Sequence, residues 1–138
     1  MFSEDEFNGN GFLELKNGNT FKGDFKNGAF HGTGEYSTSG FTYIGQFSQG
    51  NIDGKGSIKY RNGEFYEGDF QLNKKQGYGE YRYTDGTVYC GQWVEDKKHG
   101  KGRIKRANGD FMDAEFCNGE VHGEIKAKEA KWDYVAEY

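Results

Sequence analysis

The stretch Tyr66-Glu67-Gly68-Asp69-Phe70, followed by Gly77-Tyr78-Gly79 and by the pair Asp85-Gly86, decides the fold of this chain. It opens with an aromatic residue, places a glycine two positions later and a second aromatic four positions later. A Gly-x-Gly motif starts seven residues after the second aromatic. Most of the remaining chain repeats this pattern.

The repeat is regular along the sequence. The first glycine of the Gly-x-Gly motif recurs every 22 or 23 residues, at Gly9, Gly32, Gly54, Gly77 and Gly100, with Gly123 as a half match because Ile125 replaces the second glycine. The first aromatic is Phe21, Tyr43, Tyr66 and Tyr89, with Met112 in the last unit, and the second is Phe25, Phe47, Phe70, Trp93 and Phe116. A fixed period of this kind is typical of a repeat architecture in which neighbouring units stabilise one another.

Each unit is expected to form a β-hairpin. Tyr66, Gly68 and Phe70 alternate with polar residues, which places them on one face of a strand, and the glycine leaves room for neighbouring rings to lean across it. Gly79 to Tyr83 alternates in the same way and predicts the second strand. The Gly-x-Gly motif at the start of that strand indicates relief of crowding or a sharp bend.

Glycine pairs mark the connections between strands. Pairs such as Asn62-Gly63 lie between units and predict type I′ turns, because both central residues of such a turn need positive φ. Pairs such as Asn27-Gly28 lie within units and predict a longer loop. The sequence therefore predicts an all-β fold: an elongated, twisted, single-layer antiparallel meander of stacked β-hairpins.

The ends of the array depart from the pattern. The predicted array covers residues 1–123, with a half unit at 2–18, units that start at 19, 41, 64 and 87, and a degenerate unit at 110–123. Residues 124–138 contain no glycine, and their apolar residues fall at helical spacing, which predicts a short C-terminal helical cap from about Lys126. Phe2 occupies the second-aromatic position of an incomplete unit, so the chain is either a piece of a longer array or begins with a half unit that caps the sheet.

Composition narrows the class of protein. Mean hydropathy is −1.01, a value typical of disorder, but aromatic residues make up 17% of the chain and proline is absent. The net charge of −4 arises from 18 basic and 22 acidic residues that are well mixed, which argues against nucleic acid and disfavours an anionic membrane surface. The acidic N-terminus lacks the features of a signal peptide, and a reducing cytoplasmic compartment fits best.

The residues that could carry chemistry do not converge. His31, His99 and His122 each precede a Gly-x-Gly glycine in separate units. Equivalent positions in neighbouring hairpins lie roughly 10 Å apart, too far to share a zinc ion, so local hydrogen bonds are expected. Cys90 and Cys117 are likewise too far apart for a disulfide and are predicted to be free thiols. We therefore expect no catalytic residues, no metal and no cofactor.

Two ladders of side chains remain as candidate surfaces. One carries the acids and amides opposite the aromatic face, which are expected to be solvated or to contact a cation or basic partner: Asp24, Gln46, Asp69, Gln92 and Glu115. The other is the aromatic ladder, in which the rings either pack on one another as the core or present their outer faces in an open groove. Its candidate partner-binding residues are Phe21, Phe25, Tyr43, Phe47, Tyr66, Phe70, Tyr89, Trp93, Phe116 and, from the C-terminal segment, Trp132.

The repeat unit resembles the MORN (membrane occupation and recognition nexus) repeat. The closest unit combines Tyr89-Cys90-Gly91-Gln92-Trp93 with Lys98-His99-Gly100-Lys101-Gly102, and the resemblance extends from about Phe2 to Gly123. It implies an accessory or assembly role: a non-enzymatic scaffold, such as a subunit of a ciliary or cytoskeletal assembly, that binds a helix or an extended peptide. The alternatives are a peripheral phospholipid-binding module and an accessory repeat domain of a larger enzyme.

Overall fold

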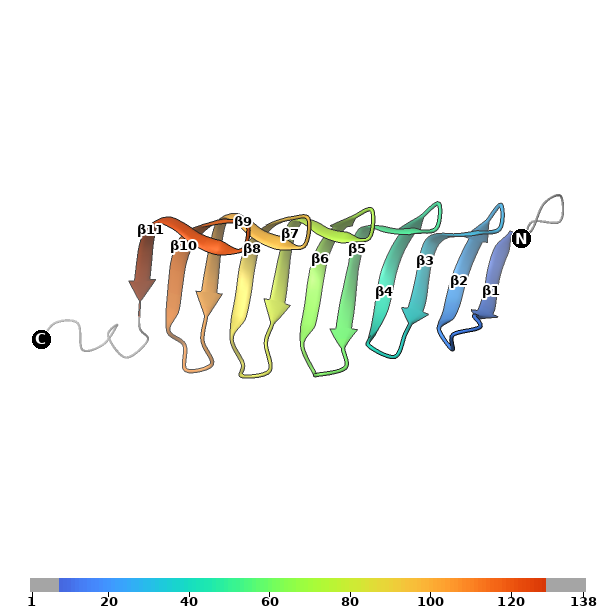
Figure 1. The fold of residues 1–138 in the computed structure, drawn as a ribbon, viewed down its shortest axis with the longest axis horizontal. Helices are drawn as coiled ribbons and strands as arrows, with labels where there is room; N and C mark the ends of the chain where they lie inside the picture. The colour runs from blue at the N-terminus through green and yellow to red at the C-terminus, as the bar shows by residue number, and fades with distance from the viewer. Residues whose placement is uncertain (1–7, 129–138) are drawn as a thin grey trace, which may run out of the picture.

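A single antiparallel sheet forms the whole of the described structure. The computed structural model describes residues 8–128. Its 11 strands pair in sequence order, each with the next, and lie side by side across the long axis of the molecule (Figure 1). They are β1 (Gly9–Glu14), β2 (Thr20–Lys26), β3 (Ala29–Ser37), β4 (Phe41–Ser48), β5 (Asn51–Tyr60), β6 (Phe65–Gln71), β7 (Lys74–Arg82), β8 (Val88–Val94), β9 (Lys97–Lys105), β10 (Phe111–Cys117) and β11 (Glu120–Lys128). The all-β, single-layer meander is confirmed.

The two kinds of turn are exchanged relative to the prediction. Within units the chain reverses in two residues, and both have positive φ, as at Asn27 (52°) and Gly28 (80°). This is the type I′ geometry that was expected between units. At the Asn62-Gly63 connection between units only the glycine has positive φ, and Gly63 N–H donates to the Tyr60 carbonyl at 3.0 Å in a longer turn. Asn-Gly pairs stand at both kinds of turn, so the dipeptide alone does not distinguish them.

Every complete hairpin contains a bulge at its Gly-x-Gly motif. Between two paired positions β6 advances two residues, from Gly68 to Phe70, while β7 advances four, from Gly79 to Lys75. The extra residues include Gly77, whose φ of 101° strongly favours glycine. The bend expected at this motif is therefore confirmed.

The strands bend toward their aromatic side. The Tyr66 hydroxyl donates to the carbonyl of Asp69 at 2.9 Å, three residues further along the same strand. A side chain that stands up from a straight strand points away from the backbone, so this contact requires the strand to curl over the ring. The aromatic side is therefore the inner face of the bent sheet, and the opposite side is its outer face.

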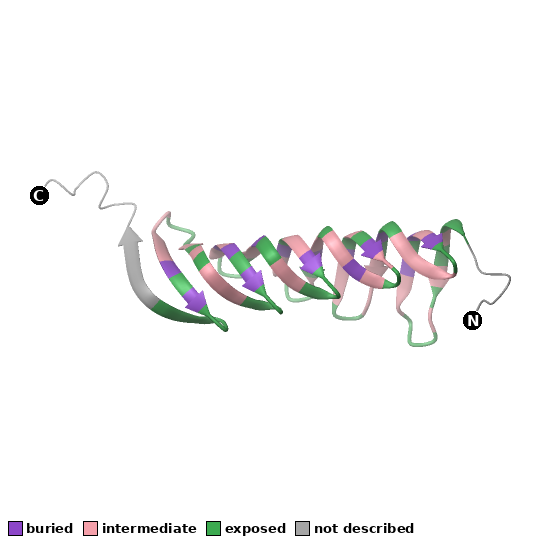
Figure 2. Cartoon of the chain, turned by 90° about the horizontal axis from the view of Figure 1, so that it is seen from above, coloured by how far each residue is buried: buried purple, intermediate pink, exposed green. Residues whose placement is uncertain are grey.

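The core lies on the inner face, where rings pack over glycines. A Cβ atom built on Gly79 would lie less than 2.5 Å from the Tyr66 ring and hydroxyl, so only glycine fits beneath this ring. The buried residues recur unit by unit along the molecule (Figure 2). Because each ring contacts its neighbours, the core is a continuous stripe rather than a set of separate clusters.

The C-terminal end differs from the prediction. Strand β11 continues to Lys128 and pairs with β10, with Ala127 opposite Met112. The helix expected from about Lys126 is therefore wrong for residues 126–128, and the cap boundary at residue 124 falls inside a strand. The rest of the predicted helix, including Trp132, lies outside the described residues. Residues 8–128 contain no helix, and so none that is long and apolar enough to span a membrane.

Candidate binding face

Nine of the ten predicted partner-binding aromatics form the core. Their exposed fractions range from 0% to 8%, and they are Phe21, Phe25, Tyr43, Phe47, Tyr66, Phe70, Tyr89, Trp93 and Phe116. Of the two alternatives, the one in which the rings pack on one another as the core is therefore correct, because almost no ring surface remains exposed to a partner. Their expected outer faces do not line an open groove. The tenth residue, Trp132, lies outside the described residues.

The core rings form a ladder of edge-to-face contacts. Tyr66 meets Phe70 of its own strand at a centroid distance of 5.1 Å and Trp93 of the next unit at 5.4 Å. Tyr43 meets Phe47 and Phe70 in the same way, at 5.2 Å each. Such pairs contribute about 0.5–1.5 kcal/mol each beyond their buried area. The ladder thus couples each unit to the next.

A second set of aromatics on the inner face is only half-buried. We call it the aromatic row, and it consists of Tyr36, Phe41, Tyr60, Tyr81 and Tyr83. Successive rings lie 4.7 to 6.4 Å apart, so the row is continuous across β3 to β7. The period-two alternation of the second strands placed Tyr81 and Tyr83 on one face. The sequence did not predict the row as a site, because its residues do not recur at one fixed position of the unit as the first aromatics do.

Polar partners fix the hydroxyl groups of the row. Asn19 Nδ2 donates to the Tyr36 hydroxyl at 3.0 Å, and the Tyr81 hydroxyl donates to Glu64 Oε1 at 2.6 Å. Burial and the hydrogen bond to Glu64 raise the pKa of Tyr81 above its usual value. The hydroxyl groups of Tyr36 and Tyr81 are therefore held in fixed orientations.

Two lysines stand among these rings. Lys75 Nζ lies 5.5 to 5.7 Å from the centroids of Tyr60, Tyr66, Tyr81 and Trp93. Lys98 Nζ lies 5.3 to 5.8 Å from Tyr83, Tyr89 and Trp93, and donates to the Tyr83 hydroxyl at 2.6 Å. Cations within about 6 Å of a ring face are attracted by its quadrupole. The inner face is therefore cationic over β7 to β9.

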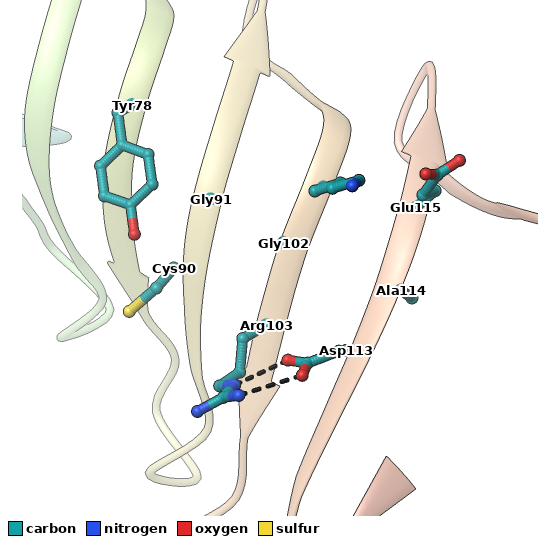
Figure 3. A pocket seen from close by; sticks show the side chains of 9 residues that line it. Tyr78, Cys90, Gly91, Gly102, Arg103, Asp113, Ala114 and Glu115 are labelled. Atoms are coloured by element: carbon teal, nitrogen blue, oxygen red, sulfur yellow. Dashed lines mark hydrogen bonds and ion pairs between the residues drawn. The ribbon is translucent and has the colours of Figure 1, made fainter. Parts of the chain in front are cut away.

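A wide hollow lies on the outer face, opposite the aromatic one. It has a volume of about 650 Å³, and its lining includes Tyr78, Cys90 and Lys101 (Figure 3). Arg103 crosses it and pairs with Asp113 at 2.6 and 3.0 Å. The hollow is wide and open, and because its strongest cation is already paired it offers no obvious ligand site.

The histidine position serves the backbone of the next turn. His31 Nδ1 accepts a hydrogen bond from the Gln49 amide at 3.4 Å, and Gln76 Oε1 accepts one from the Glu95 amide at 2.9 Å. The expected hydrogen bond is present at His31, which lies in strand β3. Residues 8–128 contain no group of three or more metal-ligating side chains, and Cys90 and Cys117 are free thiols.

The acid and amide ladder is more than a solvated surface. Gln46 Oε1 accepts the Lys55 amide at 2.8 Å, and Asp69 Oδ2 accepts the Tyr78 amide at 3.2 Å. These amides belong to the middle residue of each Gly-x-Gly motif, so the ladder satisfies the backbone at the bulge. A further hydrogen bond, from Lys55 Nζ, lowers the pKa of Asp69.

Comparisons with known proteins agree with this architecture. The TCP domain of SAS-4 from Drosophila melanogaster, solved with a proline-rich motif of Ana2, is similar at 14% identity and a TM-score of 0.44, over 86% of this chain and 70% of that one. That likeness is too weak to support an argument about function. No curated protein sequence matches the chain. The family model of the MORN repeat matches residues 1–20, 21–40, 43–65, 66–88 and 89–111, which together span most of the sequence. The expected relationship is therefore confirmed, and the chain belongs to the MORN repeat family.

Proposed function

We propose that this protein is a non-enzymatic protein-binding module that holds a segment of a partner along its inner face, as a subunit of a larger assembly. The observation that carries the proposal is the aromatic row. Its rings are continuous and half-exposed, and nothing among residues 8–128 covers them. Tyrosine is enriched at interface hot spots because it combines a large apolar ring with a hydroxyl that can hydrogen-bond.

The outer face is the weaker candidate. Its exposed apolar residues include Phe12 on β1, Ile44 on β4 and Tyr78 on β7. Each of these strands lies three strand spacings from the next, which corresponds to roughly 14 Å at the usual strand spacing. Scattered residues of this kind are normal on protein surfaces, whereas a contiguous row is not.

The setting that we propose is cytoplasmic, in a cytoskeletal or ciliary assembly as the family resemblance implies. A scaffold role fits a sheet whose described hydrogen-bonding side chains mainly satisfy its own turns and bulges. Imaging of the tagged chain in its own cells would test the setting, and a secreted or nuclear distribution would contradict it.

The binding face can be tested by paired substitutions. Tyr60→Ser with Tyr81→Ser removes two rings of the row, and Ile44→Ser with Tyr78→Ser is the matched change on the outer face. The tagged full chain is used to capture proteins from a lysate of its source cells, followed by mass spectrometry. We expect the inner-face variant to lose its specific partners while the outer-face variant keeps them, with both variants folded by circular dichroism. Equal capture by a folded inner-face variant would contradict the proposal.

A lipid-binding role makes a different prediction. Membrane association would be seen as co-sedimentation with phosphatidylcholine vesicles that contain a phosphoinositide. We expect no salt-sensitive binding, because the chain carries a net charge of −4. Binding that is lost at high salt would favour the peripheral phospholipid-binding alternative over the scaffold.

A further inference from the structure

One inner-face position changes its chemistry along the array. It is the residue of each second strand that pairs with the second aromatic of its hairpin: Phe25 with Phe30, Phe47 with Ile52, Phe70 with Lys75, and Trp93 with Lys98. The position is apolar in the first two hairpins, cationic in the next two and apolar again in the last, where Phe116 pairs with Val121. The inner face therefore has an apolar half over β2 to β5 and a cationic half over β6 to β9.

The apolar half is built around Phe30. Its ring stacks on Phe21 at a centroid distance of 3.7 Å and meets Phe47 edge-on at 5.7 Å. Phe30 is half-buried, as is Phe41 of the aromatic row, whereas Ile52 is buried. At the position that pairs with the second aromatic, this half therefore carries apolar side chains and no charge.

The cationic half holds ammonium groups that retain hydrogen-bonding capacity. The Lys75 side chain is only 12% exposed, and its Nζ forms an ion pair with Asp96 Oδ1 at 3.8 Å, a distance longer than a hydrogen bond. An ammonium has three donors, and rings satisfy none of them by a conventional hydrogen bond. Lys98 uses one donor on the Tyr83 hydroxyl. Both groups are therefore suited to a carboxylate that arrives from outside.

The spacing of the two lysines indicates the shape of the segment. Equivalent positions of neighbouring hairpins are two strands, or roughly 10 Å, apart along the molecule. Seven residues of an α-helix rise about 10.5 Å and make two nearly complete turns, so residues seven apart point to the same side. Three residues of an extended chain span the same distance but end on opposite faces. The unit period thus matches a helix with a seven-residue repeat.

We infer that the partner segment is an amphipathic helix that lies along the inner face across the strands. It carries acidic residues seven apart over Lys75 and Lys98, and apolar residues at the same heptad position over the half that holds Phe30 and Ile52. This inference rests on the proposed function and names the chemistry of the partner. The change from apolar to cationic fixes the direction in which the helix binds.

Designed peptides can test the inference on the full chain. Two labelled helical peptides of about 28 residues, four heptads each, have the same composition. In the ordered peptide the facing position reads Leu, Leu, Glu, Glu, and in the alternating peptide it reads Leu, Glu, Leu, Glu. We expect the ordered peptide to bind about tenfold more tightly by fluorescence anisotropy, because only it pairs both carboxylates with lysines.

Matched variants separate the lysines from overall charge. Lys75→Met with Lys98→Met should abolish the tenfold preference while the fold persists by circular dichroism. Lys59→Met with Lys101→Met removes the same charge from exposed outer-face positions and should keep the preference. Equal binding of the two peptides to the wild-type chain, or equal effects of the two double variants, would overturn the inference.

The outcomes also distinguish this inference from the proposed function. If the peptides are not discriminated but the Tyr60 and Tyr81 variant still loses its cellular partners, the helix inference fails and the binding face stands. If the folded Tyr60 and Tyr81 variant still captures the same cellular partners, both the helix inference and the proposed binding face fail. If Trp132→Ser with Tyr134→Ser tightens binding of the ordered peptide tenfold or more, the chain's own C-terminal residues are the occupant, which overturns the assignment to a partner.

Discussion

The central units and the last unit solve the same packing problem in different ways. In β6 and β7 the Tyr66 ring lies over Gly79, which leaves no room for a side chain there. In the last unit Met112 replaces the tyrosine, Ala114 stands at the Gly68 position, and Ile125 pairs with it. Where the ring is absent, both glycines are absent too. The glycines are therefore required by the ring above them rather than by the strand.

The largest effect should come from placing a methyl group under a central ring. In Gly79→Ala the new Cβ would lie within 2.5 Å of the Tyr66 ring, which is fully buried. We expect a loss of about 3 kcal/mol or more in the free energy of unfolding, as for other overpacked cores. Urea denaturation measures it.

Two further variants serve as controls for Gly79→Ala. Gly40→Ala should be nearly neutral, because its Cβ meets only Thr38 Oγ1 at 3.9 Å. Tyr66→Met combined with Gly79→Ala imitates the last unit, so the double variant should be more stable than the sum of the two single changes predicts. Additive losses would show that the ring is not the reason for the glycine.

High pH should weaken the central units next. Burial raises the pKa of Tyr43 and Tyr89 to about 12, against 10.0 as the ordinary value. Below pH 10 these phenols are neutral in both states and their contribution is constant. Above it the unfolded chain loses the protons first, so the free energy of unfolding falls between about pH 10 and 12.

Urea denaturation across this pH range, with tyrosinate absorbance, measures the effect. Tyr43→Phe with Tyr89→Phe should flatten the decline, since Phe21 shows that a ring without a hydroxyl is accepted at this position. An unchanged slope in the double variant would assign the decline to other groups, such as the lysines.

A smaller loss is expected from removing one hydroxyl. Tyr66→Phe deletes the hydrogen bond to the Asp69 carbonyl at 2.9 Å and leaves the ring in place. The cost should be about 1 kcal/mol, the usual net contribution of one hydrogen bond. Phe21→Tyr is the reciprocal change and should add stability if the bend of β2 matches that of β6. Denaturation of both variants tests whether the units are equivalent.

The smallest effect concerns a turn. Leu72 has a φ of 48° and is 61% exposed, whereas Asn27 and Asn118 occupy the same turn position in other units. Asparagine tolerates this left-handed conformation better than leucine, so Leu72→Asn should stabilise the fold by about 0.5 kcal/mol. A loss of stability would mean that contacts of the leucine side chain outweigh the backbone strain.

Much of the fold could be predicted because each signal is local and repeated. The alternation around Tyr66 and Phe70, the Gly-x-Gly bend and the unit length each recur, so errors in one unit are corrected by the others. The turn types were exchanged because Asn-Gly stands at both connections and only the strand register decides which is shorter. The C-terminal strand was missed because Ala127 lies at a position that fits helical and extended spacing alike.

The candidate site was harder to predict than the fold. The sequence identified which residues share the inner face but not how deep each one lies. Tyr66 and Tyr81 both lie on that face, yet the first is fully buried and the second is half-exposed. The bulge decides this, because it folds the strand over the first ring of each unit and leaves the second strand's ring at the margin.

The sequence by itself determined the repeat, the single-layer meander and the pairing of rings with glycines, since all three follow from residue spacing and the absence of a side chain. The tertiary structure alone decided that the opener aromatics are core, that the aromatic row stays half-exposed, and that Lys75 and Lys98 lie among rings. The physical reason is that burial and the placement of charges depend on the bend of the sheet. That bend results from the backbone geometry of many residues together, so no single residue of the sequence predicts it.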